Sequence, residues 1–407
     1  MSLVAEDLAD GWQPEFTIPQ HQPNRLASLR QMATRLRMID LFCGTGGFAD
    51  GFSTADTNYQ LVYAIDADPH AVATARANHP SSRIDLEDIR AVDARDLKSE
   101  VAGEGVDLIV GGPPCQGFSS LRPNRASNTN DPRNSLLINF IDFVDVFRPK
   151  LFVLENVVGI VTHSKGLTLE MVLERFSALG YSVEWKIINA AHFGVPQKRE
   201  RFVLVGSNGY GPISFPQPTH YSDSKVIGHR DRDRLQSPCS QLRPAVTFED
   251  AVSDLPPLER GETADSYDSS PRNEYQRQRR AGADTLTLHS ASKHSDKMLE
   301  VIQHAGDSIA SIPEGLVTSG FSSSYSRMRP DEPANTITVK FQSPASSKCI
   351  HPHQARTITP REAARLQSFD DRYIFCGPMT HVASQLGNAV PPLLGRAISS
   401  AITPLMS

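Results

Sequence analysis

Short apolar segments alternate with helical segments from residue 38 to about residue 214. Helical patterns cover residues 69–79 and 167–180. The apolar segments have the length and composition of buried strands and include residues 38–43, 61–66, 106–112 and 151–160. This alternation predicts an α/β fold built on a doubly wound, mostly parallel sheet. Since open sheets of this kind bind ligands at the carboxyl ends of their strands, the residues after each strand are candidates for a site.

A glycine-rich turn follows the first strand and contains Gly44, Gly46 and Gly47. Such a turn lets the backbone approach a ligand closely, and Asp66, about 20 residues later, is placed to bind ribose hydroxyls. The G-x-G-G spacing favours a small adenosine-containing cofactor over a dinucleotide. Asp88, after a third strand, could reach the adenine edge. A glycine turn without a ligand remains open on the glycines alone.

Two prolines hold a cysteine just beyond the strand at 106–112, in the run Pro113-Pro114-Cys115-Gln116-Gly117. Proline fixes its own φ and favours extended geometry in the residue before it, so the thiol is presented in a defined direction. This placement predicts a nucleophile. The alternative is a buried, inert cysteine, since free cysteine is among the most buried residue types.

Polar residues also end or precede two later strands. Glu155-Asn156 lies within the apolar segment 151–160 and is expected in the same crevice as Cys115. Gln197, Arg199 and Arg201 come immediately before another apolar run. Because residues spaced by two on an extended segment share a face, these three side chains are expected to point the same way.

At this point the chain resembles the DNA (cytosine-5) methyltransferases of bacterial type. Six blocks occur in that family's order: DLFCGTGGF (40–48), GGPPCQGFS (111–119), ENV (155–157), QKRER (197–201), RTITPREAARLQSF (356–369) and GNAVPP (387–392). Residues 1–37 and roughly 215–325 lie outside the resemblance. A match of six ordered blocks is far more specific than any single motif.

The resemblance implies methyl transfer from S-adenosylmethionine, with S-adenosylhomocysteine as product, to carbon 5 of cytosine. Cys115 would attack carbon 6 and activate the ring by covalent catalysis. Glu155, protonated, would hydrogen-bond ring nitrogen 3 and the exocyclic amine, and Arg201, supported by Arg199, would hold the carbonyl oxygen. No metal is needed. The cofactor-binding residues implied are Phe42, Gly44, Thr45, Gly46, Gly47, Asp66, Asp88, Ile89, Pro114 and Asn388.

Double-stranded DNA is the partner that the resemblance implies, and the target base must leave the helix before it can react. The polar stretch at 119–134, directly after the cysteine motif, has the composition of a mobile clamp. Arginines clustered at 277–280 and 327–329 are candidates for phosphate contacts. The expected DNA contacts nearer the nucleophile are Gln116, Ser119, Arg122, Arg133 and Gln197.

The organisation expected from these blocks has three parts. Residues 1–37 form an amino-terminal extension of unassigned role, and residues 38–214 with 384–407 form the catalytic, cofactor-binding domain. Residues 215–383 form a smaller target-recognition domain, with specificity residing in 216–325, where composition changes. The helical stretch 384–402 would return to the first domain and place Asn388 near the methionine end of the cofactor.

Composition adds modest bounds. The net charge of −5 does not by itself suggest a nucleic-acid partner, and five scattered cysteines favour a reducing compartment over a disulfide framework. With no signal peptide or membrane-length apolar run, we expect a cytoplasmic, monomeric enzyme, and a restriction endonuclease that acts on the same site is a candidate partner. The alternatives are a transfer-RNA cytosine-5 methyltransferase and a catalytically silent DNA-binding relative.

Overall fold

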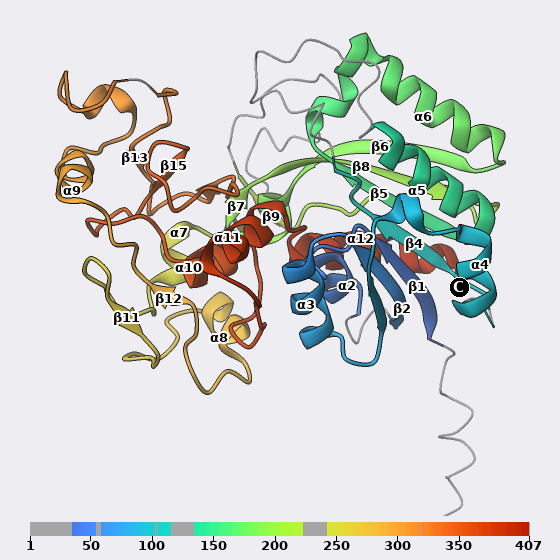
Figure 1. Ribbon diagram of the computed structural model, residues 1–407, viewed down its shortest axis with the longest axis horizontal. Coiled ribbons are helices and arrows are strands. Elements are labelled where there is room, and N and C mark those ends of the chain that lie inside the picture. The colour runs from blue at the N-terminus through green and yellow to red at the C-terminus, as the bar shows by residue number, and fades with distance from the viewer. Residues whose placement is uncertain are drawn as a thin grey trace, which may run out of the picture. The chain divides into compact units, whose positions relative to one another are not determined.

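The computed structural model describes residues 35–53, 58–101, 103, 105–114, 134–222, 242–318 and 320–406. Seven strands form the central sheet, in the order β3-β2-β1-β4-β5-β8-β6 (Figure 1). Their bounds are β1 Leu36–Leu41, β2 Tyr59–Asp66, β3 Arg83–Leu86, β4 Leu108–Gly111, β5 Leu151–Asn156, β6 Ser182–Asn189 and β8 Glu200–Ser207. Strands β1 to β5 are parallel, whereas β8 is antiparallel to both β5 and β6. The predicted doubly wound, mostly parallel sheet is confirmed.

Helices cover both faces of this sheet (Figure 1). One face packs against α2 (Gly47–Phe52), α3 (Pro69–Asn78) and α12 (Pro392–Ile402) to form a first hydrophobic core. The other face packs against α4 (Ala94–Val101), α5 (Asn134–Phe147) and α6 (Leu167–Ala178) to form a second core. The strand order reverses between β1 and β4, and crevices that bind ligands open at such a point.

Two predicted elements have different limits in the structure. The strand at 151–160 ends at Asn156, whose Oδ1 accepts a hydrogen bond from the Val157 amide at 2.8 Å and so removes that amide from the ladder. The helical stretch 384–402 is two helices, α11 (Met379–Asn388) and α12. The break follows from Pro391 and Pro392. Proline disfavours helical geometry in the residue before it, and it is a favourable residue at the first position of a new helix.

The rest of the described chain consists of short elements. The helices are α7 Phe248–Val252, α8 Glu274–Arg280, α9 Asp296–Gln303 and α10 Pro360–Leu366, and the short helical turns are Ile89–Ala91, Val158–Val161, His163–Gly166, Ala190–Phe193, Ile309–Ser311 and Thr403–Met406. The paired short strands are β7 Gln197–Lys198 with β14 Ala334–Asn335, β9 His220–Tyr221 with β10 Arg243–Pro244, β11 Thr263–Ala264 with β12 His289–Ser290, and β13 Ser326–Arg327 with β15 Lys348–Ile350. Among the described helices, none has the length and apolar character needed to cross a membrane.

A third hydrophobic core joins α7, α8, α10 and α11. The predicted domain boundary at residue 384 falls inside α11, whose Val382 and Leu386 both belong to this third core. The next helix, α12, belongs to the first core instead, through Leu394 and Ile398. The chain therefore passes from one core to the other at the break between α11 and α12.

Buried ion pairs run through the third core. Arg365 has no exposed side-chain surface, and it contacts both Asp254 and Asp371. Nearby, Arg356 binds Glu362 through two hydrogen bonds of 2.7 and 2.8 Å. Helix α10 thus presents charged side chains to the interior, where each is matched by a partner.

The arginines predicted to form a phosphate-contacting surface are for the most part engaged within the protein. Arg279 donates to Ser368 O at 2.5 Å and pairs with Asp370, and Arg280 donates to Ser269 O at 2.7 Å. Arg327 donates to backbone carbonyls that include His351 O, at 2.7 Å. The prediction of a phosphate footprint at these three arginines was wrong, because their guanidinium groups satisfy buried carbonyls and carboxylates.

A first prediction concerns Asp50 in α2. Burial, reinforced by the charge of Asp370 and opposed by Arg279 and Arg372, raises the pKa of Asp50 to about 6. An acid whose pKa is higher in the folded state than in the unfolded chain, where it is about 3.9, destabilises the protein once it ionises. Asp50→Asn should therefore increase the free energy of unfolding by about 1–2 kcal/mol at pH 7.5, with little gain near pH 4.

Chemical denaturation at both pH values would measure this effect. Asp96→Asn is the matched control, because Asp96 is also an acid in the first turn of a helix but is exposed. We expect the control to show no comparable gain. A loss of stability in Asp50→Asn at pH 7.5 would contradict the prediction.

Candidate active site

The site is built at the carboxyl edge of the sheet, where β1, β2, β4 and β5 end. The glycine turn follows β1, Asp66 ends β2, Gly112 follows β4, and Glu155 lies near the end of β5. Because parallel strands carry their carboxyl ends to one edge, residues far apart in the sequence meet there. Most of the site residues predicted from the sequence, within the described ranges, lie along or next to this edge.

The glycine turn has an unusual backbone. Phe42 and Gly44 both have positive φ, of 60° and 53°, and Gly46 has a φ of 84°. The Gly44 amide donates to Asp66 Oδ2 at 2.8 Å, and the Asp68 amide donates to Asp66 Oδ1 at 2.9 Å. Burial raises the pKa of Asp66, while these two amides lower it. The carboxylate thus holds the turn in place with one backbone bond on each oxygen.

The turn fits a nucleoside-type cofactor. A side chain built on Gly44 would meet no atom within 4 Å, so the space above this residue is open. Each Asp66 oxygen keeps a lone pair that ribose hydroxyls can use. The Thr45 hydroxyl is buried and has no hydrogen-bond partner among the described residues. Open space, free acceptors and an unpaired donor at one turn are what a polar ligand requires.

The other residues predicted to bind the cofactor differ in exposure and in the contacts that they make. Asp88 is partly exposed and forms an ion pair with Arg90 at 2.5 Å. Ile89 is buried in the second core, and Pro114 is exposed. Asn388 is the exposed last residue of α11. Their contacts with a cofactor stay predictions.

Glu155 and Arg201 form an ion pair at the centre of the edge. Glu155 Oε1 lies 2.7 Å from Arg201 Nε, and the two side chains are 11% and 13% exposed. A side chain on Gly112 would lie 3.2 Å from Glu155 Oε2. Asn156 Nδ2 donates to Pro113 O at 3.2 Å. The carboxylate therefore faces the segment that leads directly into Cys115.

Cys115 itself lies outside the described residues, as do four of the predicted DNA contacts: Gln116, Ser119, Arg122 and Arg133. Their roles stay predictions. The structure describes the strand that precedes Cys115 and the carboxylate that faces this segment.

Arg199 is buried and points away from the Glu155 carboxylate toward the second half of the chain. Its guanidinium donates to Ile337 O at 3.3 Å, Gly387 O at 3.1 Å and Ala389 O at 2.9 Å. Burial lowers the pKa of Arg199, with Arg201 adding to the effect and Glu155 opposing it, but arginine remains charged in proteins. Arg199 thus fixes the backbone on both sides of Asn388.

Gln197 was predicted to contact DNA, and this contact stays a prediction for a side chain that the structure places inside the protein. Its side chain has no exposed surface. Its amide nitrogen donates to Leu366 O and Gln367 Oε1, and its oxygen accepts from the Ile337 amide at 2.8 Å. Both the nitrogen and the oxygen of the side-chain amide are thus hydrogen-bonded inside the protein. Through these bonds Gln197 joins β7 to the segment around Ile337.

Sequence reasoning missed that the segment 334–339 belongs to the site. Strand β14 pairs with β7, Thr336 Oγ1 donates to Lys198 O at 2.7 Å, and Gly387 packs so closely that a side chain on it would lie 2.3 Å from the Val339 amide. The signal that could have indicated this proximity is the position of the segment, just after the region of roughly 215–325 that lies outside the family resemblance.

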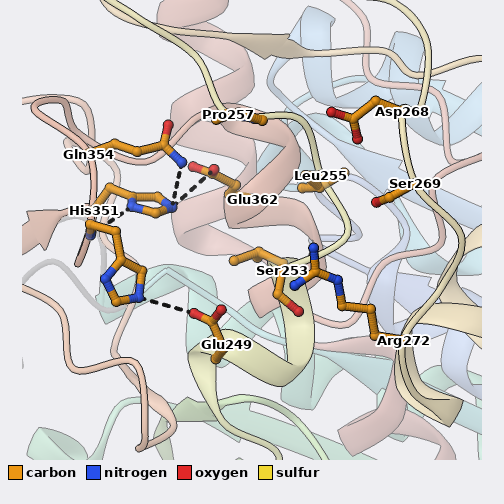
Figure 2. Close-up of a pocket in the computed structure, with 12 residues that line it drawn as sticks. Glu249, Ser253, Leu255, Pro257, Asp268, Ser269, Arg272, His351, Gln354 and Glu362 are labelled. Carbon is orange, nitrogen blue, oxygen red and sulfur yellow. Dashed lines mark hydrogen bonds and ion pairs between the residues drawn. The ribbon is translucent and has the colours of Figure 1, made fainter.

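A cavity of about 290 Å³ lies elsewhere, in the part of the chain that forms the third core. Figure 2 shows His351, Glu362 and Arg272 among the residues that line it. It shares no lining residue with the edge that carries Glu155, so it is separate from the candidate active site. In the described ranges, no group of three or more His, Cys, Asp or Glu side chains is arranged to hold a metal ion.

Comparison with known proteins agrees with this arrangement. The chain is 38% identical to Type II methyltransferase M.DdeI of Desulfomicrobium norvegicum, over 90% of this chain and 88% of that protein. It is 33% identical to Type II methyltransferase M.AgeI of Thalassovita gelatinovora, over 90% and 99% of the two chains. A crystal structure assigned as a DNA modification methyltransferase encoded within a prophage (E. coli) superposes with a TM-score of 0.68 at 25% identity, covering 91% of this chain and 99% of that one.

The model of the C-5 cytosine-specific DNA methylase family matches residues 36–403. This match spans the glycine turn, the Glu155–Arg201 pair and the Asn388 segment together. The chain belongs to the C-5 cytosine-specific DNA methylase family.

Proposed function

We propose that this protein is a DNA (cytosine-5) methyltransferase that modifies a cytosine flipped out of a specific double-stranded sequence. The observation that carries the proposal is the Glu155–Arg201 ion pair at 2.7 Å, facing the segment that leads into Cys115. A carboxylic acid and a guanidinium side by side can bind the ring nitrogen, amine and carbonyl oxygen of one cytosine edge. Membership of the C-5 cytosine-specific DNA methylase family supports the same reaction.

The cofactor is S-adenosylmethionine, which supplies an electrophilic methyl group. The open space at Gly44 would let the cofactor approach the backbone of the turn, and Asp66, which already accepts from the Gly44 amide, would also accept from the ribose hydroxyls. Arg199 holds the carbonyls of Gly387 and Ala389, so that Asn388 is presented at a fixed position. These residues bind and orient the cofactor without a metal.

The chemistry of the base falls to three side chains. The Cys115 thiolate bonds to carbon 6, and this addition makes carbon 5 nucleophilic. In the complex with the base, Glu155 would be protonated and would donate toward ring nitrogen 3, and Arg201 would donate to the carbonyl oxygen, so that both stabilise charge as it develops on the ring. Carbon 5 would then take the methyl group of S-adenosylmethionine as the sulfur–methyl bond breaks and S-adenosylhomocysteine is left. Loss of the carbon 5 proton to a base would allow the cysteine to leave by elimination, which restores the ring.

Recognition of the DNA sequence belongs to the region 215–383, together with the polar stretch after Cys115. We place the enzyme in the cytoplasm as a monomer that binds double-stranded DNA. The two Type II methyltransferases compared above are consistent with a cognate restriction endonuclease as a functional partner.

The second prediction tests the covalent step. DNA that carries 5-fluorocytosine cannot lose a proton at carbon 5, so the intact enzyme with its cofactor should form an adduct that survives denaturing electrophoresis. Cys115→Ser should abolish this adduct. Cys376→Ser, which alters a partly exposed cysteine elsewhere, should leave it intact.

Bisulfite sequencing of DNA from cells that express the chain would identify the methylated cytosine. Methylation of transfer RNA without methylation of DNA would replace the proposal by the RNA alternative. The absence of any adduct from the wild-type enzyme with DNA and cofactor would refute the covalent mechanism.

A further inference from the structure

The glycine turn receives a hydrogen bond from a residue far along the chain. Tyr373 OH donates to Thr45 O at 2.5 Å, across 328 positions of sequence. Tyr373 is only 5% exposed and belongs to the third core, which also contains Phe248 and Ile337. A side chain from the half of the molecule that contains the target-recognition region thus touches the backbone of the cofactor turn.

The glycine turn and the segment around Tyr373 are closely packed against each other. A side chain on Gly46 would lie 3.2 Å from Tyr373 OH, and one on Gly47 would lie 3.0 Å from the Phe369 ring. The Phe369 and Tyr373 rings themselves pack with centroids 4.7 Å apart. Side chains at these two glycines would therefore crowd both aromatic rings, and also His79 and the Val390 carbonyl, which lie closer still.

The other hydrogen bonds of the turn are made to the end of β2 or within the turn itself. The Gly44 amide is held by Asp66, the Cys43 amide donates to Ile65 O at 3.1 Å, and the Gly46 amide donates to Cys43 O at 2.8 Å. These bonds fix the amides at 43, 44 and 46. Tyr373 fixes a different group, the carbonyl of Thr45.

We propose that Tyr373 is a positioning residue that sets the affinity for the cofactor by orienting the Thr45–Gly46 peptide group. The inference rests on the proposed function, because it takes the turn to be the S-adenosylmethionine site. The Gly46 amide, which belongs to the same planar peptide group, is held by Cys43 O, so removing the Tyr373 hydroxyl would leave this group bonded on its amide side alone. Apparent affinity falls in proportion to the fraction of molecules in the binding-competent form. Tyr373 also makes the turn sensitive to the packing of the third core.

The test compares two tyrosines that differ in location but not in local chemistry. Tyr275 OH donates to Arg365 O at 2.5 Å, and Tyr275 is 7% exposed in the same core. Tyr373→Phe and Tyr275→Phe each remove one hydroxyl that donates to a buried carbonyl. Titration calorimetry of the full chain with S-adenosylhomocysteine should show binding about 3- to 10-fold weaker for Tyr373→Phe and unchanged for Tyr275→Phe.

Two further measurements separate positioning from general loosening. Steady-state kinetics of Tyr373→Phe should show a higher KM for S-adenosylmethionine, with kcat and the KM for DNA unchanged. Hydrogen exchange should be faster in the peptide that contains residues 43–48 in Tyr373→Phe but not in Tyr275→Phe. Both variants are expected to lose similar thermal stability.

The outcomes distinguish the inference from the proposed function. Equal cofactor affinity in Tyr373→Phe and the wild type would overturn the inference alone. An equal loss of affinity in both variants would also overturn it, since the effect would then follow stability. Failure of the wild-type chain to bind S-adenosylhomocysteine or S-adenosylmethionine would instead overturn the proposed function, and the inference with it.

Discussion

Glu155→Gln is expected to lower kcat by about 100- to 1000-fold, the range seen when one donor to a developing charge is removed. Glutamine retains the shape of Glu155 but has no carboxyl proton to give to a base. It also leaves Arg201 without the carboxylate that lies 2.7 Å from its Nε, so the guanidinium loses its orientation. Single-turnover methylation with saturating DNA and cofactor would measure the effect on chemistry directly.

Asp107→Asn provides the matched control for Glu155→Gln. Asp107 also pairs with a basic residue, Lys150, at 2.9 Å, but this pair lies where β4 and β5 begin, at the opposite edge of the sheet. We expect Asp107→Asn to reduce stability while leaving kcat near the wild-type value. Similar losses of kcat in the two variants would mean that Glu155 acts through stability and not at the reacting base.

The second large effect is expected at Asp371, and it concerns stability. Asp371 has no exposed side-chain surface and accepts from Arg365 at 2.7 Å and from Tyr267 OH at 2.6 Å. Removing one partner of a buried ion pair leaves the other charge uncompensated, which costs about 3–5 kcal/mol. Asp371→Asn should lower the free energy of unfolding by this amount in denaturant titrations at neutral pH.

The pH dependence of this contribution has a defined sign. Burial alone would raise the pKa of Asp371, but the hydrogen bond and charge of Arg365 outweigh burial and lower it. An acid whose pKa is lowered on folding stabilises the protein at neutral pH, and this stabilisation is lost as the pH falls through the lowered value. The difference between wild type and Asp371→Asn should therefore shrink under strongly acidic conditions.

Asp85→Asn is the control for this prediction. Asp85 pairs with Arg83 at 2.8 Å, but the two side chains are 31% and 46% exposed. Exposed pairs of this kind contribute about 0–1 kcal/mol. If Asp371→Asn proved no more destabilising than Asp85→Asn, the buried pairs around α10 would not hold the third core together.

The sequence allowed prediction of the parts of this fold that depend on local pattern. The apolar runs that lead to Gly44, Asp66 and Gly112 are strands of a parallel sheet that is covered on both faces. Such strands are recognisable without knowledge of their neighbours. The Pro391-Pro392 pair could also have been used locally, since it breaks the helical stretch 384–402. The apolar periodicity of 384–402 suggested one continuous helix, although the two prolines are enough to predict that it is broken.

Long-range partners could not be predicted in the same way. Arg279 and Gln197 look like surface residues in the sequence, because nothing next to them reveals the Ser368 and Leu366 carbonyls to which they donate. A charged or amide side chain is usually exposed, and it is buried only when distant groups satisfy it. The Glu155–Arg201 contact was not predicted from the strand pattern; the family resemblance implied only that both side chains bind one base, and the structure shows that they lie on the neighbouring strands β5 and β8.

The position of α12 has a consequence for the order in which the protein is made. Leu394, Ile398 and Ile402 complete the first core, against a sheet whose first strand begins at Leu36. During synthesis α2 and α3 can cover part of this face early, but the area that α12 covers stays exposed until residues 392–402 have left the ribosome, although the opposite face already has all three of its helices. Exposed apolar surface of this kind attracts chaperones and promotes aggregation. The first core, whose sheet begins at Leu36, is therefore completed only after residues 392–402 have been made.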